Sequence, residues 1–145
     1  MRASLLDFMT QGLRLGGGSD ALSQVLRPLL RETARPRVVV LAGVSGRFAR
    51  ALLQLGSEVR REDGATFLGG DASVDAVLSG PLAGDPILGL RELARAVRPG
   101  GVVLLVTGRR VERATLCAAF LHAGLAAPVQ QVSGMALLTA GRVPG

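Results

Sequence analysis

The chain has 145 residues, a formal net charge of +6 and 48% hydrophobic residues. This length and hydrophobic content fit one folded domain over residues 1–145 with a sizeable core, and they exclude intrinsic disorder. All seventeen basic residues are arginines scattered along the chain, and the four aromatic residues are all phenylalanines. Because a nucleic-acid-binding face usually combines clustered basic residues with aromatic stacking platforms, we expect an arginine-decorated surface and no nucleic-acid partner.

The sequence shows no membrane segment, secretory signal or metal-ligand set. No apolar run reaches the roughly 18–20 residues of a membrane span, and Asp7 interrupts the apolar part of the N-terminus, so we expect a cytoplasmic protein. Cys117 is the only cysteine and His122 the only histidine, which leaves no disulfide framework, metal site or catalytic triad. We expect Cys117 to be a small buried residue and His122 a structural or surface residue.

The first elements in chain order are two helices within residues 1–36. A short amphipathic helix is expected over 3–15, where Leu5, Phe8 and Met9 share one face. These three side chains could cap the sheet or contact a partner. A second helix is expected over 20–34, and Pro28 should kink it or restart it.

Residues 37–141 then alternate between strand and helix patterns. Strands are expected over 37–41, 57–62, 74–78 and 101–106, helices over 45–55, 86–97 and 111–123, and a terminal hairpin over 129–132 and 136–139. This alternation predicts an α/β fold: a mostly parallel sheet with helices on both faces and a C-terminal antiparallel hairpin. Only ten residues separate Asp63 from Val74, with a possible brief strand over 66–68. A helix–strand unit needs about 25 residues. We therefore expect two elements to be missing: the helix that follows the second strand, and the third strand.

The stretch LRELARAVRPGGVVLLV, residues 90–106, carries the clearest local pattern. Apolar residues at helical spacing predict a helix, and Pro99 should end it. Gly100-Gly101 is expected to form a tight turn. The unbroken apolar run from Val102 to Val106 predicts a strand covered on both faces.

These motifs resemble class I S-adenosylmethionine-dependent methyltransferases. A helix ending in RPGG before an apolar strand resembles the segment that leads into their fifth strand, and VDAVLSG over 74–80 resembles their fourth strand. Residues 119–142 resemble their final helix and hairpin. The resemblance covers residues 37–141 and implies a Rossmann-like methyltransferase fold, shortened between the second and fourth strands.

The cofactor loop departs from the pattern of that family, which is roughly D-x-G-x-G-x-G. Val40 stands in place of the acid, Ala42 and Val44 replace the first two glycines, and only Gly46 is kept. Because these glycines allow a tight turn and close approach of the ligand, we expect the β-branched Val44 to obstruct the loop. The resemblance therefore implies a degenerate cofactor site.

If cofactor binding persists, the resemblance assigns it to Gly43, Ser45, Gly46 and Asp63. Asp63 would then hold the ribose hydroxyls. The other interpretation treats Glu62 and Asp63 as the charged end of an edge strand. No aromatic clamp for a target amine follows the 74–78 strand, and the sequence shows no general base.

A shortened, motif-poor chain of this kind resembles most the N-terminal domain of anamorsin, a cytosolic iron–sulfur assembly and electron-transfer protein. The matching segments are 75–80, the helix 91–97 running into Pro99-Gly100-Gly101, and 115–125. This resemblance implies a non-catalytic module that binds a protein partner, without cofactor or metal. The alternative is a divergent, active methyltransferase that uses S-adenosylmethionine on a small molecule and works by proximity and orientation.

Overall fold

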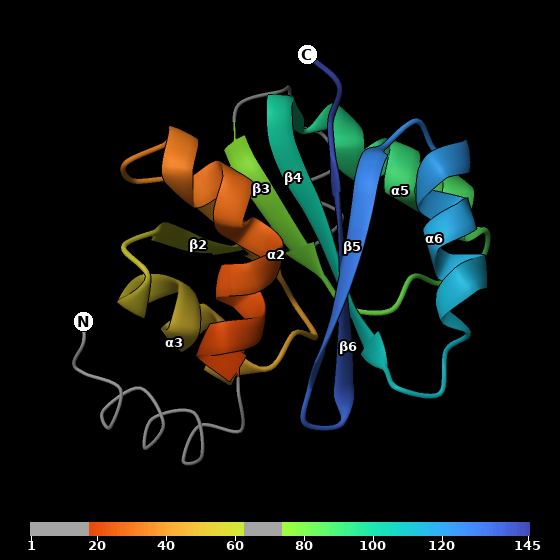
Figure 1. Ribbon diagram of the computed structural model, residues 1–145, viewed down its shortest axis with the longest axis horizontal. Coiled ribbons are helices and arrows are strands. Elements are labelled where there is room, and N and C mark those ends of the chain that lie inside the picture. Colours follow the sequence, from red (N-terminus) through yellow and green to blue (C-terminus); the bar gives the residue numbers. More distant parts are fainter. Residues whose placement is uncertain (1–17, 63–73) are drawn as a thin grey trace.

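The computed structural model describes residues 18–62 and 74–145 and consists of one twisted sheet with helices on both of its faces (Figure 1). The strands are β1 (Arg37–Leu41), β2 (Glu58–Glu62), β3 (Val74–Ser79), β4 (Val97–Gly108), β5 (Ala126–Ser133) and β6 (Ala136–Arg142). The helices are α2 (Gly18–Glu32), α3 (Gly46–Gln54), α5 (Pro86–Arg95) and α6 (Arg113–His122). No helix among these residues is long and apolar enough to cross a membrane.

The six strands lie in the order β2-β1-β3-β4-β6-β5. The pairs from β2 to β4 are parallel, whereas β6 runs antiparallel to both β4 and β5. The expected mostly parallel sheet with a C-terminal antiparallel pair is therefore confirmed. Within the described ranges β2 is an edge strand with no strand beyond it. The helix expected over 3–15 and the brief strand expected over 66–68 lie outside the described residues.

Alternation of side chains along the strands creates two cores. Val38 and Val40 of β1 pack in the core beneath α2 and α3, and Val39 and Leu41 pack in the core beneath α5 and α6. The apolar run in β4 contributes to both cores in the same way, which confirms the prediction of a strand buried on both faces. The two cores fix which helices cover which face of the sheet (Figure 1).

The RPGG segment is part of strand β4, so the expected tight turn between helix and strand was wrong. Val97 already pairs with Val74 of β3, and pairing resumes at Val102, so the intervening residues form a bulge. The bulge is held by the chain after β6: the Gly100 amide donates to the Val143 carbonyl at 2.7 Å, and the Val143 amide donates to the Gly101 carbonyl at 2.9 Å. These backbone bonds make the extended arrangement more favourable than a free turn.

Helix α2 runs through Pro28 without restarting. Proline removes one backbone donor and leaves the carbonyl four residues earlier, at Gln24, without its helical partner. Both residues lie on the exposed face of α2, where water can satisfy that carbonyl, so the helix continues.

Candidate functional site

The connections of the sheet place a crevice between the ends of β1 and β3. From β1 the chain passes through α3 to β2 on one side, whereas β3 pairs with the other side of β1 and leads into α5 on the opposite face. The loops that follow β1 and β3 therefore diverge. In open α/β sheets, ligands bind in the crevice formed where strand order reverses in this way.

A pocket of about 550 Å³ lies at this point. Its walls are the loop after β1, the loop after β3 and the first turns of α5. The lining residues are Leu41, Ala42, Gly43, Ser79, Gly80, Pro81, Leu82, Ala83, Asp85, Leu88, Gly89, Glu92 and Leu93.

Where the two loops leave the sheet, before they diverge, glycines let them approach each other and leave one side of the pocket open. Gly43 has φ +97°, a conformation that L side chains rarely adopt, and a Cβ built there would meet no atom within 4 Å. A Cβ on Gly80 would lie 3.9 Å from the Gly43 carbonyl oxygen. Gly43 therefore presents bare backbone to the open space of the pocket.

Val44 does not obstruct this loop, so that expectation was wrong. Its side chain is 4% exposed and packs in the core beneath α2 and α3, together with Phe48. The loop turns at Gly43, which directs the next side chain into the core and away from the pocket. Arg61 Nη2 donates to the Val44 carbonyl at 3.2 Å and holds the loop against β2. Val40, in the position of the missing acid, is fully buried in the same core.

Of the assigned residues that the structure describes, which are Gly43, Ser45 and Gly46, Gly43 alone lines the pocket. Ser45 is the N-cap of α3, where its Oγ accepts from the Arg47 amide at 3.4 Å, and Gly46 is the first residue of that helix. Asp63 lies outside the described residues. The acid before it, Glu62, ends β2 beside Leu41 and forms an ion pair with Arg60.

The charge of the pocket comes from two carboxylates that sequence reasoning missed. Asp85 and Glu92 are the charged side chains among the described lining residues. Asp85 caps α5 by accepting from the Ile87 amide at 2.9 Å, and Glu92 lies 3.4 Å from Arg95. Arg47, near the loop, donates to the Ser133 carbonyl at 3.1 Å. A pocket of this sign attracts cations and disfavours a pyrophosphate.

The sequence did contain a signal for this wall of the pocket. Asp85 followed by Pro86 is a helix start, with a capping acid and proline at the first helical position. Combined with the rule that ligands bind where strand order reverses, it points to the loop after β3. The stretch Ser79 to Leu82 lines the pocket although it contains no aromatic clamp.

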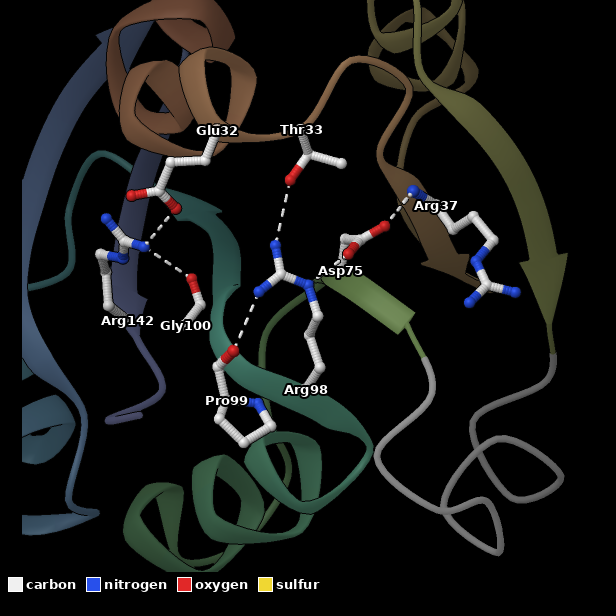
Figure 2. A network of polar contacts seen from close by, with 8 residues as sticks. All are labelled: Glu32, Thr33, Arg37, Asp75, Arg98, Pro99, Gly100 and Arg142. Carbon is white, nitrogen blue, oxygen red and sulfur yellow. Dashed lines mark hydrogen bonds and ion pairs between the residues drawn. The ribbon is translucent and has the colours of Figure 1, made fainter.

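A second polar cluster lies at the opposite edge of the sheet (Figure 2). Asp75 accepts from the Arg37 amide at 2.7 Å and pairs with Arg98 Nε, whereas Arg98 Nη2 donates to Thr33 Oγ1 at 3.1 Å. Arg142 bridges Glu32 at 2.9 Å and the Gly100 carbonyl at 2.7 Å. These bonds join the end of α2 to three strands and to the bulge of β4.

The environment of Asp75 shifts its proton affinity. Burial acts to raise the pKa of Asp75, but the hydrogen bonds from Arg37 and Arg98, together with their charges, outweigh it and hold the pKa below 3.8. The carboxylate is therefore ionised and engaged within the fold, and this cluster serves stability rather than ligand binding.

Cys117 and His122 do not line the pocket between β1 and β3. Cys117 is half-buried, not fully buried as the sequence predicted, because it lies on the flank of α6, between the core face and solvent. His122 ends α6 on the surface, and its carbonyl accepts from Arg91 Nη2 at 3.2 Å. Within residues 18–62 and 74–145, no group of three or more His, Cys, Asp or Glu side chains is placed to hold a metal ion.

Comparison with solved structures identifies the fold. A 1,6-didemethyltoxoflavin-N1-methyltransferase from Burkholderia thailandensis, solved with 1,6-didemethyltoxoflavin and S-adenosylhomocysteine bound, is 17% identical with a TM-score of 0.64, over 96% of this chain and 86% of that one. An S-adenosylmethionine-dependent methyltransferase from Thermotoga maritima is 14% identical with a TM-score of 0.53, over 97% and 96%. The chain has the class I methyltransferase fold.

The methyltransferase fold is seen also in an O-methyltransferase family protein from Burkholderia thailandensis, which is 18% identical with a TM-score of 0.56 over 88% of this chain. This chain spans 58% of the length of that protein. No family model and no curated protein sequence matches the chain. The more specific resemblance to anamorsin stays a hypothesis.

Proposed function

We propose that the chain is a methyltransferase that uses S-adenosylmethionine on a small molecule, with the cofactor in the crevice between β1 and β3. The observation that carries the proposal is an acidic pocket, lined by bare glycine backbone, at the reversal of strand order in a methyltransferase fold. The neighbour from Burkholderia thailandensis that binds S-adenosylhomocysteine supports the same choice of cofactor. The sequence analysis gave this function as the alternative hypothesis. It is supported here by the loop after β1, in which Val44 packs in the core and Gly43 lines the pocket.

The pocket fits the cofactor in size and in charge. Its volume of about 550 Å³ lies within the usual range of roughly 300–1,000 Å³ for small-molecule sites. S-adenosylmethionine carries positive charge on its sulfonium and ammonium groups, which suits the carboxylates of Asp85 and Glu92. When bound, the cofactor supplies an electrophilic methyl group to a nucleophile.

The residues of the chain would bind and orient rather than exchange protons. The Gly43 backbone would let a ligand approach β1 closely, and the carboxylates of Asp85 and Glu92 would attract the positive part of the ligand. No histidine, lysine or cysteine lines the pocket among the described residues. Catalysis would therefore come from proximity and orientation, as the sequence alone suggested.

Calorimetric titration with S-adenosylhomocysteine tests this proposal. We expect a dissociation constant in the micromolar range for the wild-type chain. Gly43→Ala should weaken binding at least tenfold, because its methyl group would stand in the pocket. Gly56→Ala is a matched control: Gly56 has a similar φ of +89° and open space around its Cβ, but lies outside the pocket. Equal affinities in the two variants, or no binding by the wild type, would contradict the proposal.

Asp63→Ala tests the contact that the resemblance assigned to the ribose. We expect it to abolish binding of S-adenosylhomocysteine while the circular dichroism spectrum stays unchanged. Unchanged affinity would remove Asp63 from the site and leave Glu62, at the end of β2, as the acid nearest to that position.

A second candidate function is a non-catalytic module that binds a protein in the cytoplasm, as the resemblance to anamorsin implies. It is favoured by the replacement of the conserved pattern at Val40 and Ala42, which removes an acid and a glycine from the loop. The same titration separates the two candidates. Micromolar binding of S-adenosylhomocysteine would exclude the non-catalytic module, and absence of any heat of binding would favour it.

A further inference from the structure

The loop after β1 takes its shape from the residues that flank Gly43. Gly43 lies at φ +97°, and nothing stands within 4 Å of the place where a Cβ would be. A glycine in open space has wide conformational freedom, and it has no side chain that could fix the loop by packing. The contacts of the flanking residues therefore decide whether Gly43 keeps its place in the wall of the crevice pocket.

The residue after Gly43 is anchored by three different groups. The Val44 side chain packs in the core beneath α2 and α3, and the Val44 amide donates to the Leu41 carbonyl at 3.3 Å. The Val44 carbonyl accepts from Arg61 Nη2 at 3.2 Å. The first two anchors come from the core and from β1, whereas the third comes from a side chain of β2.

The place of Arg61 on β2 explains this third contact. Arg61 follows Val59 by two residues, and Val59 packs against the core beneath α2 and α3, so both side chains belong to that face of the sheet. Arg61 also pairs with Val40, near the end of β1. Its guanidinium therefore meets the loop where the chain turns from β1 toward α3.

We propose that Arg61 is a positioning residue for the ligand of the crevice: its bond to the Val44 carbonyl holds the loop in the conformation in which Gly43 lines the pocket. The inference rests on the proposed function for the identity of that ligand. Arg61 is not among the described residues that line the pocket, so it acts through the backbone of the loop.

The positive charge of Arg61 gives this proposal a sharp test, because charge and positioning predict opposite effects. S-adenosylmethionine carries a net positive charge, which an arginine beside the loop repels. If Arg61 acted through its charge alone, removing it would tighten binding. If Arg61 holds the loop, removing it weakens binding, because the ligand must then order the loop, which costs free energy.

Calorimetric titration with S-adenosylmethionine measures the sign of the effect. We expect Arg61→Met to bind about fivefold more weakly than the wild type, the effect of losing one hydrogen bond in the loop. Arg50→Met is a matched control: the exposed Arg50 side chain on α3 has no hydrogen bond or ion pair within residues 18–62 and 74–145, and this variant should bind at least as tightly as the wild type. Unchanged or tighter binding by Arg61→Met, or an equal loss in both variants, would overturn the proposal.

Nuclear magnetic resonance of the free proteins and a conservative variant separate positioning from a general loss of structure. Because the Arg61 side chain is exposed, Arg61→Met should stay folded and shift the amide signals of residues 43–45 more than those of the sheet. Arg61→Lys keeps a donor and should bind S-adenosylmethionine more tightly than Arg61→Met. Unchanged loop signals in Arg61→Met, or weaker binding by Arg61→Lys than by Arg61→Met, would overturn the proposal.

The positioning role and the proposed function fail in different experiments. Shifted loop signals in Arg61→Met, without binding of S-adenosylmethionine by the wild type, would refute the methyltransferase function and sustain the hold of Arg61 on the loop. Equal binding of S-adenosylmethionine by the wild type and Arg61→Met would sustain the function and refute the positioning role.

Discussion

Polar groups are arranged differently at the two edges of the sheet where the parallel strands begin and end. At the edge where β1, β3 and β4 begin, Arg98 donates to Asp75 and to the Pro99 carbonyl, and Arg142 donates to Glu32 and to the Gly100 carbonyl (Figure 2). At the edge where β1 and β3 end, Asp85 and Glu92 line an open cavity beside bare backbone. One edge therefore joins its charged groups into a network between elements, whereas at the other each carboxylate has a single partner near it in sequence and also lines a cavity.

The largest effect should come from closing the space at Gly101. A Cβ there would stand 2.4 Å from the Asp75 carbonyl oxygen and 2.4 Å from Val97 Cγ1. Gly101→Ala must push two strands apart, so we expect it to lower the free energy of unfolding by about 3 kcal/mol in urea denaturation. A Cβ on Gly108, at the other end of the same strand, would meet nothing within 4 Å. Gly108→Ala should therefore change the free energy of unfolding by less than about 0.5 kcal/mol. Similar losses in both variants would contradict the contrast between the edges.

Removing the carboxylate at the centre of the cluster should have the next largest effect. The Asp75 side chain is 13% exposed and accepts from Arg37 and Arg98. Asp75→Ala leaves both donors without this partner, and we expect a loss of about 2 kcal/mol in the same denaturation assay. Binding of S-adenosylhomocysteine should not change, because Asp75 lies at the edge away from the pocket. A loss of affinity without a loss of stability would reverse the roles given to the two edges.

The fold could be predicted from the sequence because apolar residues recur with the periods of buried helices and strands. The apolar run at Val102–Val106 and the alternation of strand and helix needed only local patterns and the rules of α/β topology. The bulge at Pro99–Gly101 could not be read in this way. It depends on backbone bonds to Val143, more than forty residues later, and a local pattern does not report such a contact.

The candidate site was predicted less well, for a related reason. Gly43 was identified from its loop, but the direction of the Val44 side chain depends on how the loop turns, and the motif comparison assumed that it faces the ligand. Asp85 and Glu92 reach the same pocket as Gly43 only because β3 pairs with β1 in space. Strand order is a long-range property, so sequence spacing alone did not bring these residues together.

The contribution of Asp75 to the free energy of unfolding should depend on pH, and this effect should be smaller than the loss caused by Asp75→Ala. Its pKa is lower in the folded chain than its unfolded value of about 3.9. The carboxylate therefore contributes its full stability above that pH and loses it as the pH falls through the folded pKa. We expect the difference in unfolding free energy between wild type and Asp75→Asn to be constant from pH 5 to 7 and to shrink below about pH 4. A difference that grows in acid would show the opposite sign of shift.

The smallest effect should come from the edge that faces the ligand. Glu92 is partly exposed and forms only a surface pair with Arg95, so Glu92→Gln should change stability by less than about 0.5 kcal/mol. If its charge attracts a cationic ligand, affinity for S-adenosylhomocysteine, whose ammonium group remains, should fall about threefold, and more so at low salt. Glu58→Gln, an exposed glutamate on β2 outside the pocket, provides the matched control and should leave affinity unchanged. Because stability and affinity respond separately here, an equal loss of stability in Glu92→Gln and Asp75→Asn would remove the distinction between the two edges.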